Sequence, residues 1–221
     1  MAVPAQVIES VRERLRDMES VRYTDQDLVD AYNDALDEIA DATEFYELSA
    51  VVKRRKWALY TDLRGILPPE FLRVKAVWNM STNRWLDPTD IRELDLRLTR
   101  GWEKNANLSR WWFMRGMWHL GAYPVPGDDY SNLKVYYASL VPHISLGDVD
   151  FVPSGTFPFP PDFNCAIEFY MLFSLLADAG ETQKALGFWS QYAELEEQLK
   201  AMVQQRMTRD RIVHMGARRS W

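Results

Sequence analysis

Histidine, cysteine and carboxylate side chains are the groups of this chain that could catalyse a reaction or bind a metal. The histidines lie far apart and none pairs with another at metal-ligand spacing: His119, His143 and His214. His143 with Asp148 and Asp150 could bind a cation, although ordinary loop polarity explains the same residues. Cys165 falls in the most apolar predicted helix, where a free cysteine behaves as a small hydrophobe rather than a nucleophile. The sequence therefore predicts no metal, no cofactor and no catalytic residue.

Sequence motifs for catalysis and nucleic-acid binding are missing as well. The chain has no phosphate-binding Gly-rich loop, no dinucleotide fingerprint, no Gly-x-Ser-x-Gly motif and no helix-turn-helix or zinc-finger signature. Carboxylate pairs arise by chance in an acidic chain, so they are no evidence of acid/base catalysis. We expect that the chain is not an enzyme. A hydrolase that acts on cell-wall sugar through carboxylates and a Trp-lined groove is an alternative, but nothing positions a specific pair.

Arginine recognition of carboxylates is the chemistry that the C-terminus offers. From Arg206 onward the chain has five Arg against one Asp, net +4, whereas the whole chain has a net charge of −6. Arg forms bidentate pairs with carboxylates, and a terminal Trp can fill a pocket. We interpret residues 206–221 as an arm that docks on another protein, although simple disorder of a terminus would fit too. The predicted contact residues are Arg206, Arg209, Arg211, His214, Arg218, Arg219 and Trp221.

The opposite charge is concentrated at the N-terminus. Residues 1–50 hold thirteen Asp and Glu against four Arg. An acidic body argues against tight wrapping of nucleic acid, which needs cationic contacts to phosphate. In the predicted second helix these carboxylates form either an ordinary solvated face or a surface that faces a channel or a partner: Asp30, Asp34, Asp37, Glu38 and Asp41.

Four helices are predicted to position these residues. The first spans roughly Pro4 to Met18, and the second follows Thr24, which forms a capping box with Asp27. The third runs from Phe163 to Asp178, is capped by Asp162, stops at Gly180 and is expected to be central and buried. The last runs from Glu181 to about Met207 with one apolar stripe: Ala185, Phe188, Trp189, Tyr192, Leu195, Leu199 and Val203.

Between the helices, short aromatic and branched segments punctuated by Gly and Pro predict four or five antiparallel strands. They are Trp57–Tyr60, Phe71–Met80, Arg110–Gly116, Met117–Ala122 and Leu133–Leu140. A short helix is predicted over Thr89–Leu98. Seven of the nine Trp fall between residues 57 and 118. Core and cross-strand packing is the favoured explanation for them, with a subunit interface or a stacking platform for bases or sugars as alternatives.

The predicted fold class is α+β and mainly α: a bundle of four main helices with an inserted small antiparallel β subdomain and an extended C-terminal arm. Residues 1–205 form one domain, helical over 1–55 and 160–205 with a β-rich insertion at 56–159, and residues 206–221 form the arm. No secretory signal and no membrane-spanning run is recognised. A single cysteine excludes internal disulfides and suits a reducing cytosol.

The order of these elements resembles the head-to-tail adaptor, or connector, proteins of tailed bacteriophages, especially the short-tailed type. The resemblance covers residues 20–205 and rests on four stretches: the acidic Asp27–Ile39 segment, the Leu67-Pro-Pro-Glu-Phe71 strand start, the Gly121–Gly127 turn before Leu133–Ala138, and Phe159-Pro-Pro-Asp-Phe163 before the closing helices. The Trp-dense middle and the long Pro-rich loop over 141–161 depart from the pattern.

The resemblance implies a structural protein of the virion at the head–tail junction, made in the host bacterial cytoplasm. Such adaptors form a ring, typically of twelve copies, below the portal protein. They extend the DNA channel and offer a platform for the tail tube or nozzle protein, and a C-terminal arm commonly grips the portal. Double-stranded DNA would pass without specific binding, and no membrane is involved. A nucleic-acid-binding module that uses the basic tail and the Trp-rich strands is the alternative function.

Overall fold

The computed structural model describes residues 4–55, 58–98, 102–104, 107–125, 130–146 and 163–216. The chain divides into two compact units. Tyr46–Ser139 is the sheet unit, and Met1–Phe45 together with Leu140–Trp221 is the helical unit. The chain thus enters the helical unit, leaves it for the sheet unit and returns.

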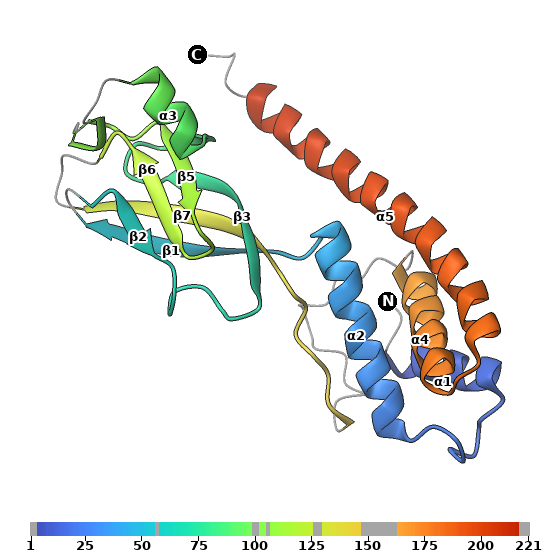
Figure 1. Ribbon diagram of the computed structural model, residues 1–221. Helices are drawn as coiled ribbons and strands as arrows, with labels where there is room; N and C mark the ends of the chain where they lie inside the picture. Colours follow the sequence, from blue (N-terminus) through green and yellow to red (C-terminus); the bar gives the residue numbers. More distant parts are fainter. Residues whose placement is uncertain are drawn as a thin grey trace. The chain divides into compact units, whose positions relative to one another are not determined.

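The helical unit has four α-helices among its described residues (Figure 1): α1 (Pro4–Leu15), α2 (Asp25–Thr43), α4 (Asn164–Asp178) and α5 (Thr182–Gly216). α4 packs against α1, α2 and α5. Its buried side chains include Ile167, Met171 and Leu175, and the Tyr23 hydroxyl donates a hydrogen bond to the Leu175 carbonyl (3.3 Å). The predicted four helices are therefore confirmed, with α4 at their centre.

Helix boundaries agree with the sequence signals except at the first and last helices. α1 ends at Leu15, before the predicted end at Met18, and Arg16 after it has a φ of +55°. Gly180 has a φ of +78°, a left-handed conformation that glycine adopts without strain, and it follows α4 as predicted. α5 is longer than predicted, because its backbone stays helical through Gly216. The predicted cap Asp162 lies outside the described residues.

The described residues of the sheet unit form seven strands: β1 (Glu47–Arg55), β2 (Tyr60–Asp62), β3 (Phe71–Asn79), β4 (Arg84–Pro88), β5 (Trp111–Arg115), β6 (His119–Tyr123) and β7 (Tyr130–Ser139). Their order in the sheet is β1-β7-β3-β4-β5-β6-β2. The pairs are antiparallel except β4 with β5, which run parallel. The unit also contains α3 (Ile91–Arg97) and a 3-10 turn, η1 (Trp102–Lys104).

The predicted fold class is wrong. The described residues contain five α-helices and a seven-stranded, mixed, curled sheet, which makes a sheet-rich half-barrel core instead of a helical bundle with a small antiparallel insertion. Six strands contribute side chains to a single buried cluster, which includes Val52, Val77, Leu86, Leu120 and Val135. A sheet that wraps its own core in this way is a folding unit rather than an appendage of the helices.

β1 explains most of the error, because residues 47–55 were assigned to the helical part. Every residue of β1 pairs with a residue of β7, from Glu47 with Ala138 to Arg55 with Tyr130. Its inward positions alternate as Leu48, Ala50, Val52 and Arg54, so the period of two is present in the sequence. The charged Arg54 at an inward position disguised it.

Arg54 is the largest fully buried side chain of the described residues, with 0% of its surface exposed. Its guanidinium donates to the carbonyls of Ala58 (2.7 Å), Leu59 (3.2 Å) and Ala122 (2.6 Å) and to the Ser109 hydroxyl (3.3 Å). Burial lowers the pKa of Arg54 to about 10, so the group remains charged at neutral pH. This one side chain ties β1 to the segment before β2 and to β6.

Packing accounts for the tryptophans of the sheet unit that the structure describes. Trp102 and Trp112 are buried, Trp118 contacts the Phe71 ring (5.4 Å between centroids) and Trp111 stacks on Tyr123 (5.9 Å). The prediction of core and cross-strand packing is confirmed for them. Trp57 lies outside the described residues.

Candidate functional site

The acidic face of α2 is held in place by the cap at the start of the helix. The Thr24 backbone N–H donates to Asp27 Oδ2 (2.8 Å), and the Asp27 N–H donates to Thr24 Oγ1 (3.2 Å). The predicted capping box is therefore confirmed. Hydrogen bonds from Thr24 hold the pKa of Asp27 below its usual value. Leu28, Leu36 and Ile39 bury the opposite face, so the carboxylates of α2 turn outward.

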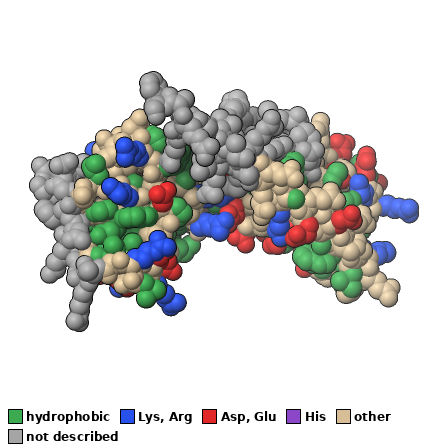
Figure 2. Space-filling model, turned by 90° about the horizontal axis from the view of Figure 1, so that it is seen from above, with side chains coloured by type: hydrophobic (Ala, Val, Ile, Leu, Met, Phe, Trp, Pro, Cys, Tyr) green, Lys and Arg blue, Asp and Glu red, His purple; other side chains and the backbone are tan. Residues whose placement is uncertain are grey.

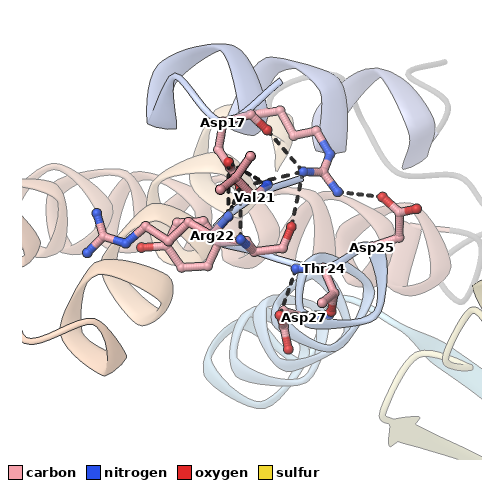
Figure 3. Close-up of polar contacts among 8 residues, drawn as sticks. Asp17, Val21, Arg22, Thr24, Asp25 and Asp27 are labelled. Carbon is pink, nitrogen blue, oxygen red and sulfur yellow. Dashed lines mark hydrogen bonds and ion pairs between the residues drawn. The ribbon is translucent and has the colours of Figure 1, made fainter. Parts of the chain in front are cut away.

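A polar network fixes the turn that leads into this helix (Figure 3). The Asp17 carboxylate accepts backbone hydrogen bonds from Val21 (3.0 Å), Arg22 (3.1 Å) and Tyr23 (2.8 Å). The backbone hydrogen bond from Tyr23 is the main reason that the pKa of Asp17 is lowered. Arg12 of α1 donates to the carbonyls of Asp17 and Tyr23 and pairs with the Asp25 carboxylate at the start of α2. α1 therefore sets where α2 begins.

The five predicted carboxylates of α2 do not share one environment. Asp30, Asp34 and Asp41 are exposed. Asp37 Oδ2 is bonded to His143 Nε2 (2.9 Å), and Glu38 lies on the side of α5. Three of the five carboxylates are thus exposed, with Asp30 accepting a hydrogen bond from Gln26 Nε2 (2.7 Å), whereas Asp37 and Glu38 are half-buried.

Glu38 sits near a charged pair of α5. Burial is the first cause that raises the pKa of Glu38, followed by the charges of Glu196 and Asp41, while Lys200 acts in the opposite direction. Lys200 forms an ion pair with Glu196 and another with Glu197 (3.1 Å). The acidic face of α2 and helix α5 are therefore electrostatically linked through Glu38.

The segment after the sheet unit is anchored to α2 by a buried amide. Asn33 Nδ2 donates to the Ile144 carbonyl (3.0 Å), and the Ile144 N–H donates to Asn33 Oδ1 (3.0 Å). His143 reaches Asp37 on the same helix. Asp148 and Asp150, the other two members of the considered cation site, lie outside the described residues. Over the described part of the chain, no group of three or more His, Cys, Asp or Glu side chains has a metal-binding arrangement.

α5 carries the predicted arm. Four members of the predicted apolar stripe are buried and form its seam, Ala185, Tyr192, Leu199 and Val203, whereas Trp189 of the same predicted stripe is 37% exposed. At 35 residues the helix is about 50 Å long, and in Figure 1 its C-terminal part extends beyond α2 and α4. Arg206, Arg209, Arg211 and His214 lie on its helical backbone, but their side chains are outside the described ones. Arg218, Arg219 and Trp221 follow the helix and are not described.

Cys165 departs from its predicted environment. The side chain is exposed, because Ala166, Ile167 and Met171 form the buried side of α4. Strong overall hydrophobicity of a helix does not say which side is covered. Sequence reasoning also missed the Asn33–Ile144 and Asp37–His143 bonds, which join residues more than a hundred positions apart and leave no local signal.

Comparison with known proteins gives the family. No described helix is long and apolar enough to cross a membrane. No curated protein sequence matches the chain. The family model of the SU10 adaptor protein matches residues 4–219, which covers both units. Membership of a structural adaptor family implies a virion component at the head–tail junction and a protein that is not an enzyme. The chain belongs to the SU10 adaptor protein family, a family of phage head-to-tail adaptors.

Proposed function

We propose that this adaptor forms a ring, of twelve copies, between the portal protein and the tail tube or nozzle protein. The family match over residues 4–219 is the observation that carries the proposal. The ring would continue the DNA channel and provide the surface on which the tail is built. The chain would be made in the host cytoplasm and incorporated when the DNA-filled head is joined to the tail.

The basic end of the chain is the proposed portal-binding arm. α5 continues for thirteen residues beyond Val203, the last buried seam residue among the described side chains, into the segment that begins at Arg206 with a net charge of +4. Arginine suits a carboxylate-bearing portal surface, because its guanidinium forms paired hydrogen bonds with carboxylates.

The acidic face of α2 is the proposed channel lining. α2 has seven Asp and Glu and no Lys or Arg between Asp25 and Thr43. Exposed carboxylates such as Asp30, Asp34 and Asp41 repel phosphate, so DNA would slide past without binding. Asp37 and Glu38 belong to the same proposed lining and would support it through His143 and α5.

Deletion of residues 206–221 tests the arm. The truncated protein should lose only the helical signal of residues 206–216 from its circular dichroism spectrum, keep its thermal unfolding transition and lose attachment to purified portal rings. A full-length variant with Arg206, Arg209 and Arg211 changed to Gln should weaken attachment in the same direction, while the control pair Arg92→Gln and Arg110→Gln, on exposed residues of the sheet unit, should not. Undiminished portal binding by the truncated protein would show that the arm is not the docking element.

A DNA-binding measurement distinguishes the proposed channel lining from the alternative nucleic-acid-binding function. The wild-type chain should bind double-stranded DNA negligibly at two salt concentrations, whereas a nucleic-acid-binding module would show a steep salt dependence. Changing Asp30, Asp34 and Asp41 to Asn should increase DNA retention and slow DNA ejection from assembled particles. An ejection rate equal to that of the wild type would show that the acidic face of α2 does not line the channel.

A further inference from the structure

The outer face of the sheet carries a row of apolar and aromatic side chains. Val51 of β1 is opposite Lys134 of β7, Lys134 is opposite Trp78 of β3, and Trp78 is opposite Trp85 of β4. Trp78 contacts Trp85 with 5.0 Å between ring centroids, and Trp85 contacts Tyr136 at 5.3 Å. Lys134 Nζ lies 5.0 Å from the centre of the Tyr136 ring. These five residues form a continuous surface, which we call the aromatic face.

The aromatic face is not the side of the sheet that holds the core. The buried cluster uses the alternate positions of the same strands, such as Val52, Val77 and Val135. α3 covers another part of the sheet, where Leu94 packs with Phe113 of β5 and Tyr123 of β6. Val51 remains 51% exposed, and Trp78 and Trp85 are half-buried. Clustered aromatic and aliphatic side chains of this kind are typical of protein interfaces.

A second apolar surface lies on the outer side of α5. Leu186 is 57% exposed and Trp189 is 37% exposed, with the Trp189 ring packed on Phe173 (4.8 Å). Further along the helix, Glu194 and Glu197 are exposed. We call Leu186, Trp189, Glu194 and Glu197 the α5 ridge. Leu186 and Trp189 lie one turn apart on the helix, unlike the other large hydrophobic residues of the helical unit that the structure shows as exposed.

The two units have opposite net charges. The sheet unit has 15 Lys and Arg against 10 Asp and Glu, net +5, and the remaining residues have 11 against 22, net −11. Figure 2 shows Lys and Arg among hydrophobic side chains over the sheet unit, and more Asp and Glu over the helical unit. Lys134 on the aromatic face and the glutamates of the α5 ridge follow the same division. Opposite charges steer such surfaces together and suppress contacts between like surfaces.

We propose that the aromatic face of one copy binds the α5 ridge of a second copy. The proposal rests on the ring assembly proposed above and names its interface. The two surfaces differ and each copy carries both, so the contact is head-to-tail and repeats from copy to copy, as closure into a ring requires. Apolar side chains supply the binding energy, and the opposite net charges of the two units set the orientation.

Two exposed residues test the interface without disturbing the core. Val51→Glu places a charge in the aromatic face and Leu186→Glu places one in the ridge. Each should weaken self-association about tenfold or more, measured as the distribution of particle masses by mass photometry and sedimentation. The matched controls are Val21→Glu and Leu96→Glu, since Val21 is 81% exposed and Leu96 is 87% exposed elsewhere in the chain. Circular dichroism of all four variants verifies that they fold.

Mixing the two interface variants gives the sharpest result. Val51→Glu keeps an intact ridge and Leu186→Glu keeps an intact aromatic face, so an equal mixture should form one-to-one dimers and nothing larger. Assembly of either variant alone to wild-type size would show that the changed surface takes no part in self-association. A wild-type chain that stays monomeric up to its highest soluble concentration would also overturn the proposal.

The same variants distinguish this interface from the other proposals. A chain without residues 206–221 should still self-associate, so a failure of portal binding would leave the interface untouched. If Val51→Glu removed DNA binding of the wild-type chain without changing its assembly, the aromatic face would be a nucleic-acid surface and the proposal would be wrong.

Discussion

Asn33 and Ile144 exchange two buried hydrogen bonds, each 3.0 Å long, between the Asn33 amide and the backbone of Ile144. The Asn33 side chain thus supplies the Ile144 backbone with the donor and the acceptor that a neighbouring strand would otherwise provide. The bonds fix the return of the chain from the sheet unit onto α2, beside the His143–Asp37 pair.

Changing Asn33 to Leu should release this segment. Both backbone groups of Ile144 would lose their partners, and burying them unpaired costs about 2 kcal/mol or more of unfolding free energy. Hydrogen exchange at the Ile144 amide should accelerate accordingly. The control is Gln26→Ala on the same helix, where an exposed hydrogen bond to Asp30 is removed and stability should stay within about 0.5 kcal/mol of wild type. Equal effects of the two changes would count against the anchoring role.

Changing Arg54 to Met should destabilise the sheet unit strongly. The substitution removes the donors to three carbonyls and leaves those groups inside the core, so a loss of about 3 kcal/mol or more is expected in chemical denaturation. Arg110→Met is the matched control, because Arg110 is exposed on the same unit and its loss should change stability by less than about 0.5 kcal/mol. A mild effect of the Arg54 substitution would mean that water replaces its bonds.

Glu38 predicts a stabilising substitution with a defined pH dependence. Its pKa in the folded protein is raised above 4.5, so its contribution to stability is fully present below that pH and is lost as pH rises through the folded pKa. Glu38→Gln should therefore raise the melting temperature at pH 7, by a free energy of no more than about 1 kcal/mol, and have no effect at pH 3. Glu9→Gln, on an exposed position of α1, should show no such difference. If the higher melting temperature of Glu38→Gln persisted at pH 3, better packing and not the loss of a charge would be its cause.

Asp17 predicts the opposite pH dependence. Its pKa is lowered from 3.8 by backbone hydrogen bonds, so its stabilising effect is present above pH 3.8 and is lost as pH falls through the folded value. Asp17→Asn should lower the melting temperature at pH 7 and flatten the acid limb of the stability profile. The test is a pair of thermal melts across pH 2 to 7, and parallel curves for wild type and variant would contradict the assignment.

Two glycines predict opposite effects of the same substitution. A Cβ at Gly121 would lie 2.5 Å from the buried Phe113 ring, so Gly121→Ala should cost about 1–3 kcal/mol. Gly187 is inside α5 with nothing within 4 Å of the added atom, so Gly187→Ala should stabilise by about 0.5–1 kcal/mol. Urea denaturation of both variants checks the signs, and destabilisation by both would show that the space beside Gly187 is not open.

The helices could be predicted because their signals are local. The Thr24–Asp27 cap and the spacing of Leu28, Leu36 and Ile39 fix α2 within a few residues. The third and fourth helices are separated by Gly180, whose conformation the sequence also predicts. In each case the determining residues lie within one or two turns of each other.

The sheet was underestimated because its pairing is not local. β1 pairs with β7, about eighty residues later, and β4 meets β5 in a parallel contact that no turn residue announces. The helix predicted over Thr89–Leu98 is shorter than expected, because Pro88 is the last residue of β4 and Asp90 caps α3 through the Arg92 N–H (3.0 Å). The net positive charge of the sheet unit could not be predicted either, because the boundaries of the unit depend on the pairing of β1 with β7.

The acidic face of α2 lies within the described residues, whereas the side chains of the C-terminal arm do not. Asp30, Asp34 and Asp41 are exposed as a lining would need, whereas Asp37 and Glu38 are engaged by His143 and α5. The proposed contact residues of the arm, from Arg206 to Trp221, have side chains outside the described part of the chain.

The continuous backbone of α5 also has a mechanical consequence. A single helix from Thr182 to Gly216 has no hinge between its buried base and its far end, so it works as a lever about 50 Å long. A force on the far end, perpendicular to the helix axis, would produce a torque at the base. The packing of Ala185, Tyr192 and Leu199 would have to resist it. Strain applied at one end of this protein would therefore be delivered to the packing between α4 and α5, about thirty residues away.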